Sequence, residues 1–257
     1  MAKRVVIAIF LLMLTFSLGA CNESDNRVQT NDINYKLTEF TDSKSTDELN
    51  YNIKYPQLSG LSDVDKQTKI NNILKDEALK VLKYYEEPYG SVEVNIDYTI
   101  VLKTTNILSI QYSGVGYVSN AAHPNNLFYT TNINIKAGKR LRLTDIVNID
   151  EDLASTFLND GFKALWSEQG EALEHITNEE ILQNFKDADS LDNIGTEKQS
   201  DVFSYFTNDS LGISISVSHA IGDHAEFEIK YQDIKDNIKS ENEIWNDLLN
   251  SGFESNN

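Results

Sequence analysis

Residues 92–112 read VEVNIDYTIVLKTTNILSIQY, and this stretch decides the fold class. Apolar side chains occupy every second position from Val92 to Ile100, which is typical of a strand with one buried face. The turn residues Thr104-Thr105-Asn106 precede a second alternating run at 108–112. The sequence therefore predicts an antiparallel hairpin.

Similar patterns on both sides of this hairpin predict the other elements. Alternation predicts strands near residues 33–37, 49–55, 129–135, 203–206, 211–217 and 227–231. Apolar residues at three- and four-residue steps predict helices near 62–86, 150–169, 177–185 and 244–253, the first opened by a Ser62/Asp65 capping box and the third by a Thr177/Glu180 one. Strands in adjacent hairpins without regular βαβ alternation predict the α+β class, with a mostly antiparallel sheet and a few packed helices.

The charge balance excludes some functions. The 257 residues hold 22 Lys+Arg and 40 Asp+Glu, a formal net charge of −18, which argues against binding to nucleic acid. The single cysteine excludes an intramolecular disulfide and a Cys-rich zinc site. We also find no GxSxG, P-loop or GxGxxG motif, so the sequence predicts neither an enzyme nor a cofactor.

The N-terminus has the pattern of an export signal. Lys3 and Arg4 precede an apolar run from Val5 to Phe16, which is short for a membrane span of about 20 residues. The following Leu18-Gly19-Ala20-Cys21 resembles the lipobox of bacterial lipoproteins. That resemblance implies a signal peptide at 1–20 and a lipid on Cys21 that holds the protein at the outer side of the bacterial cell membrane. The alternative is an ordinary secretory signal in which Cys21 is incidental.

The exported part divides into a tether and a larger module. Residues 21–32 begin with Cys21, on which the lipobox resemblance implies a lipid, and continue almost without apolar residues, which predicts a flexible tether. We place an N-terminal half at 33–120 and a C-terminal half, with the closing helix, at 121–257. Removal of Lys3 and Arg4 takes the charge from −18 to −18 − 2 = −20, which favours attraction of cationic partners.

Four short segments resemble one family of envelope domains. They are 55–61 (YPQLSGL) before a helix with Ile70-Asn71, then Ala122-His123-Pro124, 135–146 (IKAGKRLRLTDI) and 227–234 (FEIKYQDI). These motifs are similar to those of the paired domains of unknown function found in the extracytoplasmic part of the lysozyme-sensing anti-sigma factor and in the non-catalytic region of some peptidoglycan deacetylases. The resemblance covers about residues 33–238.

The resemblance implies a non-enzymatic binding or sensing module. The leading ligand is lysozyme or another cationic protein, and the alternative is cell-wall glycan such as peptidoglycan. An uncharacterised wall-polymer hydrolase is the competing class. Within the histidine-proline loop, His123 with Asn125 and Asn126 forms a polar group that can present ligand contacts.

Two other groups have more than one interpretation. His219, Asp223 and His224 carry metal-binding side chains, but their spacing matches no helical ligand motif, so a polar turn is favoured over a metal site. Tyr84, Tyr85 and Tyr89 are interpreted as the cover of a helix end, with a sugar-stacking or protein-contact surface as the alternative.

Overall fold

A computed structural model of the chain describes residues 33–86, 90–174, 176–193 and 198–251. The predicted signal peptide, Cys21 and tether lie outside these ranges, as does Tyr89. Within the ranges described, no helix has the length and apolar character needed to cross a bilayer.

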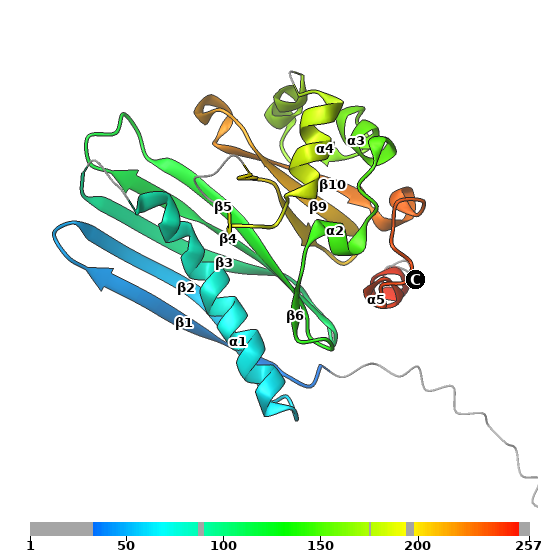
Figure 1. The fold of residues 1–257 in the computed structure, drawn as a ribbon, viewed down its shortest axis with the longest axis horizontal. Helices are drawn as coiled ribbons and strands as arrows, with labels where there is room; N and C mark the ends of the chain where they lie inside the picture. The colour runs from blue at the N-terminus through cyan, green and yellow to red at the C-terminus, as the bar shows by residue number, and fades with distance from the viewer. Residues whose placement is uncertain (1–32, 87–89, 175, 194–197, 252–257) are drawn as a thin grey trace, which may run out of the picture. The chain divides into compact units, whose positions relative to one another are not determined.

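The N-terminal part of the described chain forms a six-stranded sheet (Figure 1). Its spatial order is β1 (Lys36–Ser45), β2 (Leu49–Ser59), β3 (Val92–Lys103), β4 (Ile107–Val118), β5 (Asn125–Asn134) and β6 (Lys139–Leu141). Neighbouring strands are antiparallel except β2 and β3, which run parallel. A parallel pair needs a crossover connection, and helix α1 (Val64–Leu79) supplies it.

Helix α1 covers one face of this sheet, and its N-terminal cap differs from the prediction. Ile70, Leu74 and Ala78 are fully buried. The helix begins after Asp63, whose carboxylate accepts a hydrogen bond from Lys66 N at 2.9 Å, so the predicted Ser62/Asp65 capping box is wrong. The chain continues from α1 into the 3-10 helix η1 (Lys80–Tyr85).

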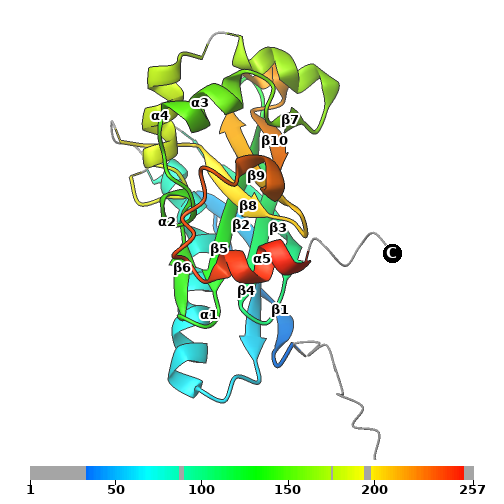
Figure 2. The same ribbon diagram turned by 90° about the vertical axis from the view of Figure 1, so that its right-hand side faces the viewer.

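A second sheet follows, with four antiparallel strands. Its spatial order is β7 (Lys163–Ala164), β10 (His224–Lys230), β9 (Ser210–Ser216) and β8 (Phe203–Phe206). The helices that follow the first sheet are α2 (Leu143–Ile146), α3 (Glu151–Leu158), α4 (Asn178–Lys186) and α5 (Ile244–Ser251), with 3-10 helices η2 (Ser167–Leu173), η3 (His219–Ile221) and η4 (Tyr231–Ile234). Figure 2 shows α3 and α4 beside this second sheet.

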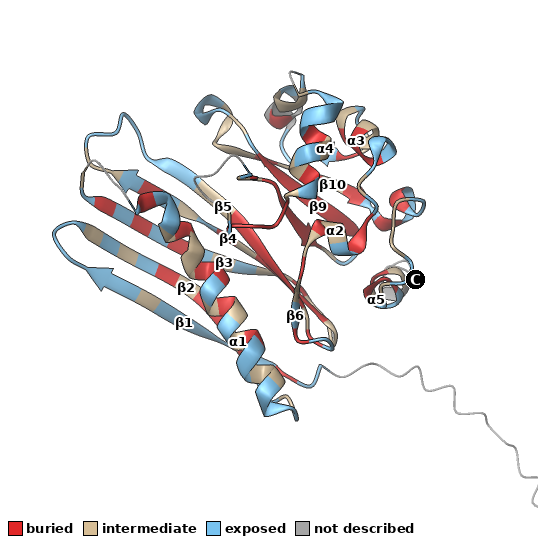
Figure 3. Ribbon diagram, viewed as in Figure 1, coloured by how far each residue is buried: buried red, intermediate tan, exposed pale blue. Residues whose placement is uncertain are grey.

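Two apolar cores pack against the sheets, and each also takes in residues of the other sheet. One core joins α1 and η1 to β2–β5, and the other joins the outer face of β8–β10 to the later helices. Trp245 of α5 is 2% exposed and donates from Nε1 to Ile146 O at 2.9 Å, which confirms its predicted place in the core. Figure 3 shows the buried residues along the middle strands of both sheets.

The two sheets meet through polar groups along β4, β5 and β8. Ser204 O accepts from Thr130 Oγ1 at 2.5 Å and from Asn132 Nδ2 at 2.8 Å. Phe206 N donates to Ser109 Oγ at 3.0 Å. We call this set of contacts the seam; it fixes β8 against the six-stranded sheet.

The predicted α+β class with mostly antiparallel sheet is confirmed, but one helix is shorter than predicted. The helix expected at 150–169 ends at Leu158, because Asp160 takes a left-handed φ of 62° and the chain turns there. Residues 163–164 then pair with β10. The boundary placed between residues 120 and 121 lies in the connection from β4 to β5, two paired strands of one sheet.

Candidate functional site

A cleft of about 410 Å³ lies between η1, β5 and the second sheet. Such a volume is within the usual range for ligand sites, about 300–1,000 Å³. Apolar and aromatic groups form much of its lining, among them Val81, Tyr84, Tyr85, Leu127, Phe128, Leu191 and Phe203. Its polar lining includes Asn125, Asn126, Asp201, Ser214, Ser216, Asp223 and His224.

The cleft follows an edge of β5. Strand β6 pairs with β5 only at residues 132–134, so along 125–131 this edge has no partner strand in the described part of the chain. On this edge, Asn126 N donates a hydrogen bond to Asp223 Oδ2 at 2.7 Å. The cleft therefore lies beside the part of β5 that has no neighbouring strand on this edge.

Two tyrosines of η1 form one wall. Tyr85 lies across Gly116 of β4, where a Cβ atom would come within 1.8 Å of the tyrosine hydroxyl oxygen, so only glycine fits. The Tyr84 hydroxyl donates to Asp201 at 2.5 Å. The prediction that these rings cover the helix end fits Tyr85, which is 9% exposed, while Tyr84 remains 37% exposed beside the cleft.

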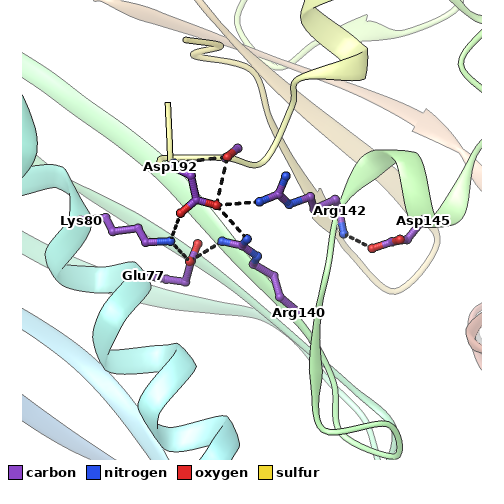
Figure 4. A network of polar contacts seen from close by, with 7 residues as sticks. Glu77, Lys80, Arg140, Arg142, Asp145 and Asp192 are labelled. Atoms are coloured by element: carbon purple, nitrogen blue, oxygen red, sulfur yellow. Dashed lines mark hydrogen bonds and ion pairs between the residues drawn. The ribbon is translucent and has the colours of Figure 1, made fainter. Parts of the chain in front are cut away.

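The segment around Leu191 also lines the cleft, and a network of ion pairs holds it beside η1 (Figure 4). Asp192 contacts Lys80 of η1, Arg142 Nη2 at 2.8 Å and Arg140 Nη2 at 3.2 Å. Glu77 of α1 contacts Arg140 and lies 2.8 Å from Lys80 Nζ. The hydrogen bond from Lys80, with help from Arg140, holds the pKa of Asp192 well below its ordinary value, so this carboxylate stays charged.

A buried carboxylate fixes the start of the same segment. Asp189 is 5% exposed and accepts hydrogen bonds from Leu143 N at 2.6 Å, Ser204 N at 2.5 Å and Ser204 Oγ at 2.7 Å. Burial raises the pKa of Asp189 to about 6 although these hydrogen bonds oppose the shift. The segment is thus tied to α2 and β8 through one side chain.

The mouth of the cleft brings two turns together. The His123 ring, from the β4–β5 connection, stacks on His219 of η3 with centroids 3.6 Å apart and planes 8° apart. His219 Nδ1 lies 3.0 Å from both Asp223 carboxylate oxygens. Burial raises the pKa of Asp223, but the hydrogen bonds from Asn126 N and His219 outweigh it and lower the pKa overall. We call His123, His219, Asp223 and Asn126 the latch.

The floor is formed by alternate residues of β9 and β10. Ser214 is 1% exposed, and the His224 ring stacks on Phe128 at 4.7 Å between centroids. His224 Nε2 lies 3.8 Å from Glu226 Oε1. Burial lowers the pKa of His224, so the imidazole is neutral near pH 7.

The predicted site residues are partly brought together. Asn125 and Asn126 line the cleft, whereas His123 lies at its mouth. His219 and Asp223 are in contact, but His224 packs on Phe128 instead. No group of three or more His, Cys, Asp or Glu in the described residues is placed to hold a metal ion.

The charge of the lining limits the ligand. Among the described residues that line the cleft, the charged side chains are the carboxylates Asp201 and Asp223, and none is a Lys or Arg. Anionic groups such as phosphate are therefore disfavoured, and cationic or uncharged groups are favoured.

Comparison with known proteins places this fold among uncharacterised domains. Residues 42–126 match the family model described as Deacetylase PdaC. The structure is similar to that of a member of the DUF3298 family from Bacteroides fragilis NCTC 9343, with 16% identity, a TM-score of 0.54 and coverage of 85% of this chain and 98% of that one. A DUF3298 family protein from Pseudomonas aeruginosa PAO1 matches with 12% identity and a TM-score of 0.45 over 80% of this chain and 93% of that one. No curated protein matches.

These matches concern the fold and the domain family of the predicted resemblance. The chain has the fold of a DUF3298 protein, a domain of unknown function, and the PdaC match spans the end of β1 through the start of β5. The links to a lipid anchor and to lysozyme sensing stay predictions.

Proposed function

We propose that this protein is a non-enzymatic binding module, anchored by a lipid on Cys21 outside the cell membrane, and that its ligand is lysozyme or a similar cationic protein. The observation that carries this proposal is the lining of the cleft, where Asp201 and Asp223 lie among aromatic rings with no Lys or Arg among the described lining residues. Carboxylates pair with basic side chains, and aromatic faces attract them through cation–π contacts.

The charge of the whole chain supports the same partner. The charge of −18 − 2 = −20 that the proposed mature chain carries raises the rate of encounter with a cationic protein and makes that rate sensitive to salt. The two features have separate roles, because long-range charge brings the partner to the surface and the cleft selects one of its side chains.

Calorimetric titration of the full chain with lysozyme, at low and at physiological salt, tests the proposal. An unrelated protein of equal positive charge serves as the control for charge alone. We expect saturable binding at physiological salt that exceeds the control. Equal weak binding of both proteins would contradict the proposal.

Two aspartate variants locate the binding surface. Asp201→Asn removes one charge from the cleft, whereas Asp97→Asn removes one from an exposed pair with Lys54 elsewhere on the first sheet. We expect Asp201→Asn to weaken lysozyme binding several-fold more than Asp97→Asn. Equal effects would place the partner outside the cleft.

Cell-wall glycan is the second candidate, and the amides of Asn125 and Asn126 beside the aromatic Tyr84 and Phe128 favour it. Aromatic stacking on sugars and amide hydrogen bonds are weakly screened by salt. Titration with soluble peptidoglycan fragments would then give an affinity that salt hardly changes. Turnover of the fragments that is lost on changing His123 or Asp223 would instead support a hydrolase.

A further inference from the structure

Two polar atoms at the floor of the cleft are buried without hydrogen-bond partners. They are Ser214 Oγ and His224 Nδ1, and both residues line the cleft. Native proteins leave few buried polar groups unpaired, because each costs free energy. A ligand group that bonds to both atoms removes this cost when it binds.

The surroundings of His224 indicate which kind of group this is. Its Nε2 faces Glu226 Oε1 at 3.8 Å, while Phe128 stacks on the ring and fixes its plane. We assign the hydrogen of the neutral imidazole to Nε2, the side of the carboxylate, and this assignment leaves Nδ1 with only a lone pair to offer. Ser214 Oγ accepts hydrogen bonds as well, so the floor suits a donor.

The rest of the cleft adds charge and an apolar passage. Asp201 and Asp223 make the lining acidic, and Val81, Leu191 and Phe203 provide apolar contacts for a chain of methylene groups. An ammonium is a compact group with three donors, and in lysine it stands at the end of a flexible four-carbon stem. Both features match this cleft.

We propose that the floor of the cleft is a subsite for a primary ammonium group on an alkyl stem, as presented by a lysine side chain of the protein partner. The inference rests on the proposed function and names the group recognised. Ser214 Oγ and His224 Nδ1 accept from the ammonium, and Asp201 and Asp223 balance its charge.

A small probe tests the subsite directly. N-acetyl-lysine methylamide is titrated into the full chain, with binding followed by calorimetry and by the NMR signals of the His224 imidazole; the same compound with its ε-amine acetylated is the uncharged control. We expect saturable binding of the amine that shifts the His224 signals, and at least about tenfold weaker binding of the acetylated compound, since hydrogen bonds to a charged group are the stronger ones. Equal affinity for both compounds would overturn the inference.

A matched pair of variants then tests the floor. Ser214→Ala removes an unpaired hydroxyl, so the fold should tolerate it, and we expect a loss of probe affinity of about fivefold or more. Thr131→Val removes a buried hydroxyl of β5 that does not line the cleft and should leave affinity unchanged. Unchanged affinity in Ser214→Ala, with the fold intact by thermal unfolding, would refute the subsite.

Lysozyme titrations separate this inference from the proposed function. Equal binding of lysozyme to the wild-type chain and to Ser214→Ala would overturn the subsite while the proposed function stands. Binding of the amine probe with no binding of lysozyme would support the subsite and contradict the proposed partner.

Discussion

Replacing Arg140 by Met tests whether the network in Figure 4 holds the cleft wall. Glu77 is 4% exposed, and its carboxylate contacts Arg140 and, at 2.8 Å, Lys80 Nζ. Removing one partner of a buried ion pair costs about 3–5 kcal/mol. Because Lys80 remains and the Arg140 side chain is 21% exposed, we expect a smaller loss, about 2–3 kcal/mol in the free energy of unfolding.

Denaturant unfolding of four chains measures this loss and its origin. They are the wild type, Arg140→Met, Glu77→Gln and the double variant. In the Glu77→Gln background no buried carboxylate is stranded, so Arg140→Met should cost less than half as much there. Lys136→Met, which breaks an exposed pair with Glu243, should stay within about 0.5 kcal/mol of wild type. The reasoning fails if Arg140→Met costs the same in both backgrounds, or no more than Lys136→Met.

Three further predictions concern the site. Burial raises the pKa of Asp189 from 3.8 to about 6, so the folded state holds the proton more tightly and stability falls as pH rises from about 4 to 6. At about 1.4 kcal/mol per pKa unit, the free energy of unfolding falls by about 3 kcal/mol over this pH range. Asp189→Asn should lack this pH dependence, and the same pH dependence in the variant and the wild type would contradict the prediction. Gly212→Ala would put a Cβ atom 2.1 Å from a Tyr205 ring carbon, so we expect a loss of about 1–3 kcal/mol in denaturant unfolding; an unchanged midpoint would be evidence against this packing. Burial lowers the pKa of His224 below 6.5, so stability is lost as pH falls through that value, and an NMR titration midpoint above 6.5 would rule this out.

Local patterns predicted most elements because each depends on neighbours in the sequence. The hairpin at 92–112 has the expected turn, and the Thr177/Glu180 capping box is present. The helix at 150–169 was overextended because Phe162, Leu165 and Trp166 continue a helical spacing after the helix has ended. Phe162 is buried, but Trp166 is 64% exposed, a difference that spacing alone does not contain.

Less of the site was predictable, because its residues come from distant segments. Asn125 and Asn126 were found through the motif around His123. Ser214 and His224 were not assigned to a cleft, since polar residues that alternate along a strand look alike whether they face water or another sheet. Here they face the first sheet, as the stacking of His224 on Phe128 shows.

The cleft is a consequence of how the two sheets meet. Along the seam, Asn132 donates to Ser204 O and accepts from Ser109, and Ser204 Oγ donates to Asp189, so no ligand is needed to satisfy these groups. Along residues 125–131 β5 has no pairing with β6, and on the facing side of β9 and β10 the atoms Ser214 Oγ and His224 Nδ1 have no hydrogen-bond partner. The floor therefore belongs to strands that are fixed by their backbone pairing and by the seam. The latch at the mouth, in contrast, joins two turns only through ring stacking and one carboxylate. A partner should meet a rigid floor and a more adaptable mouth, so selectivity for the inserted group is expected from the floor.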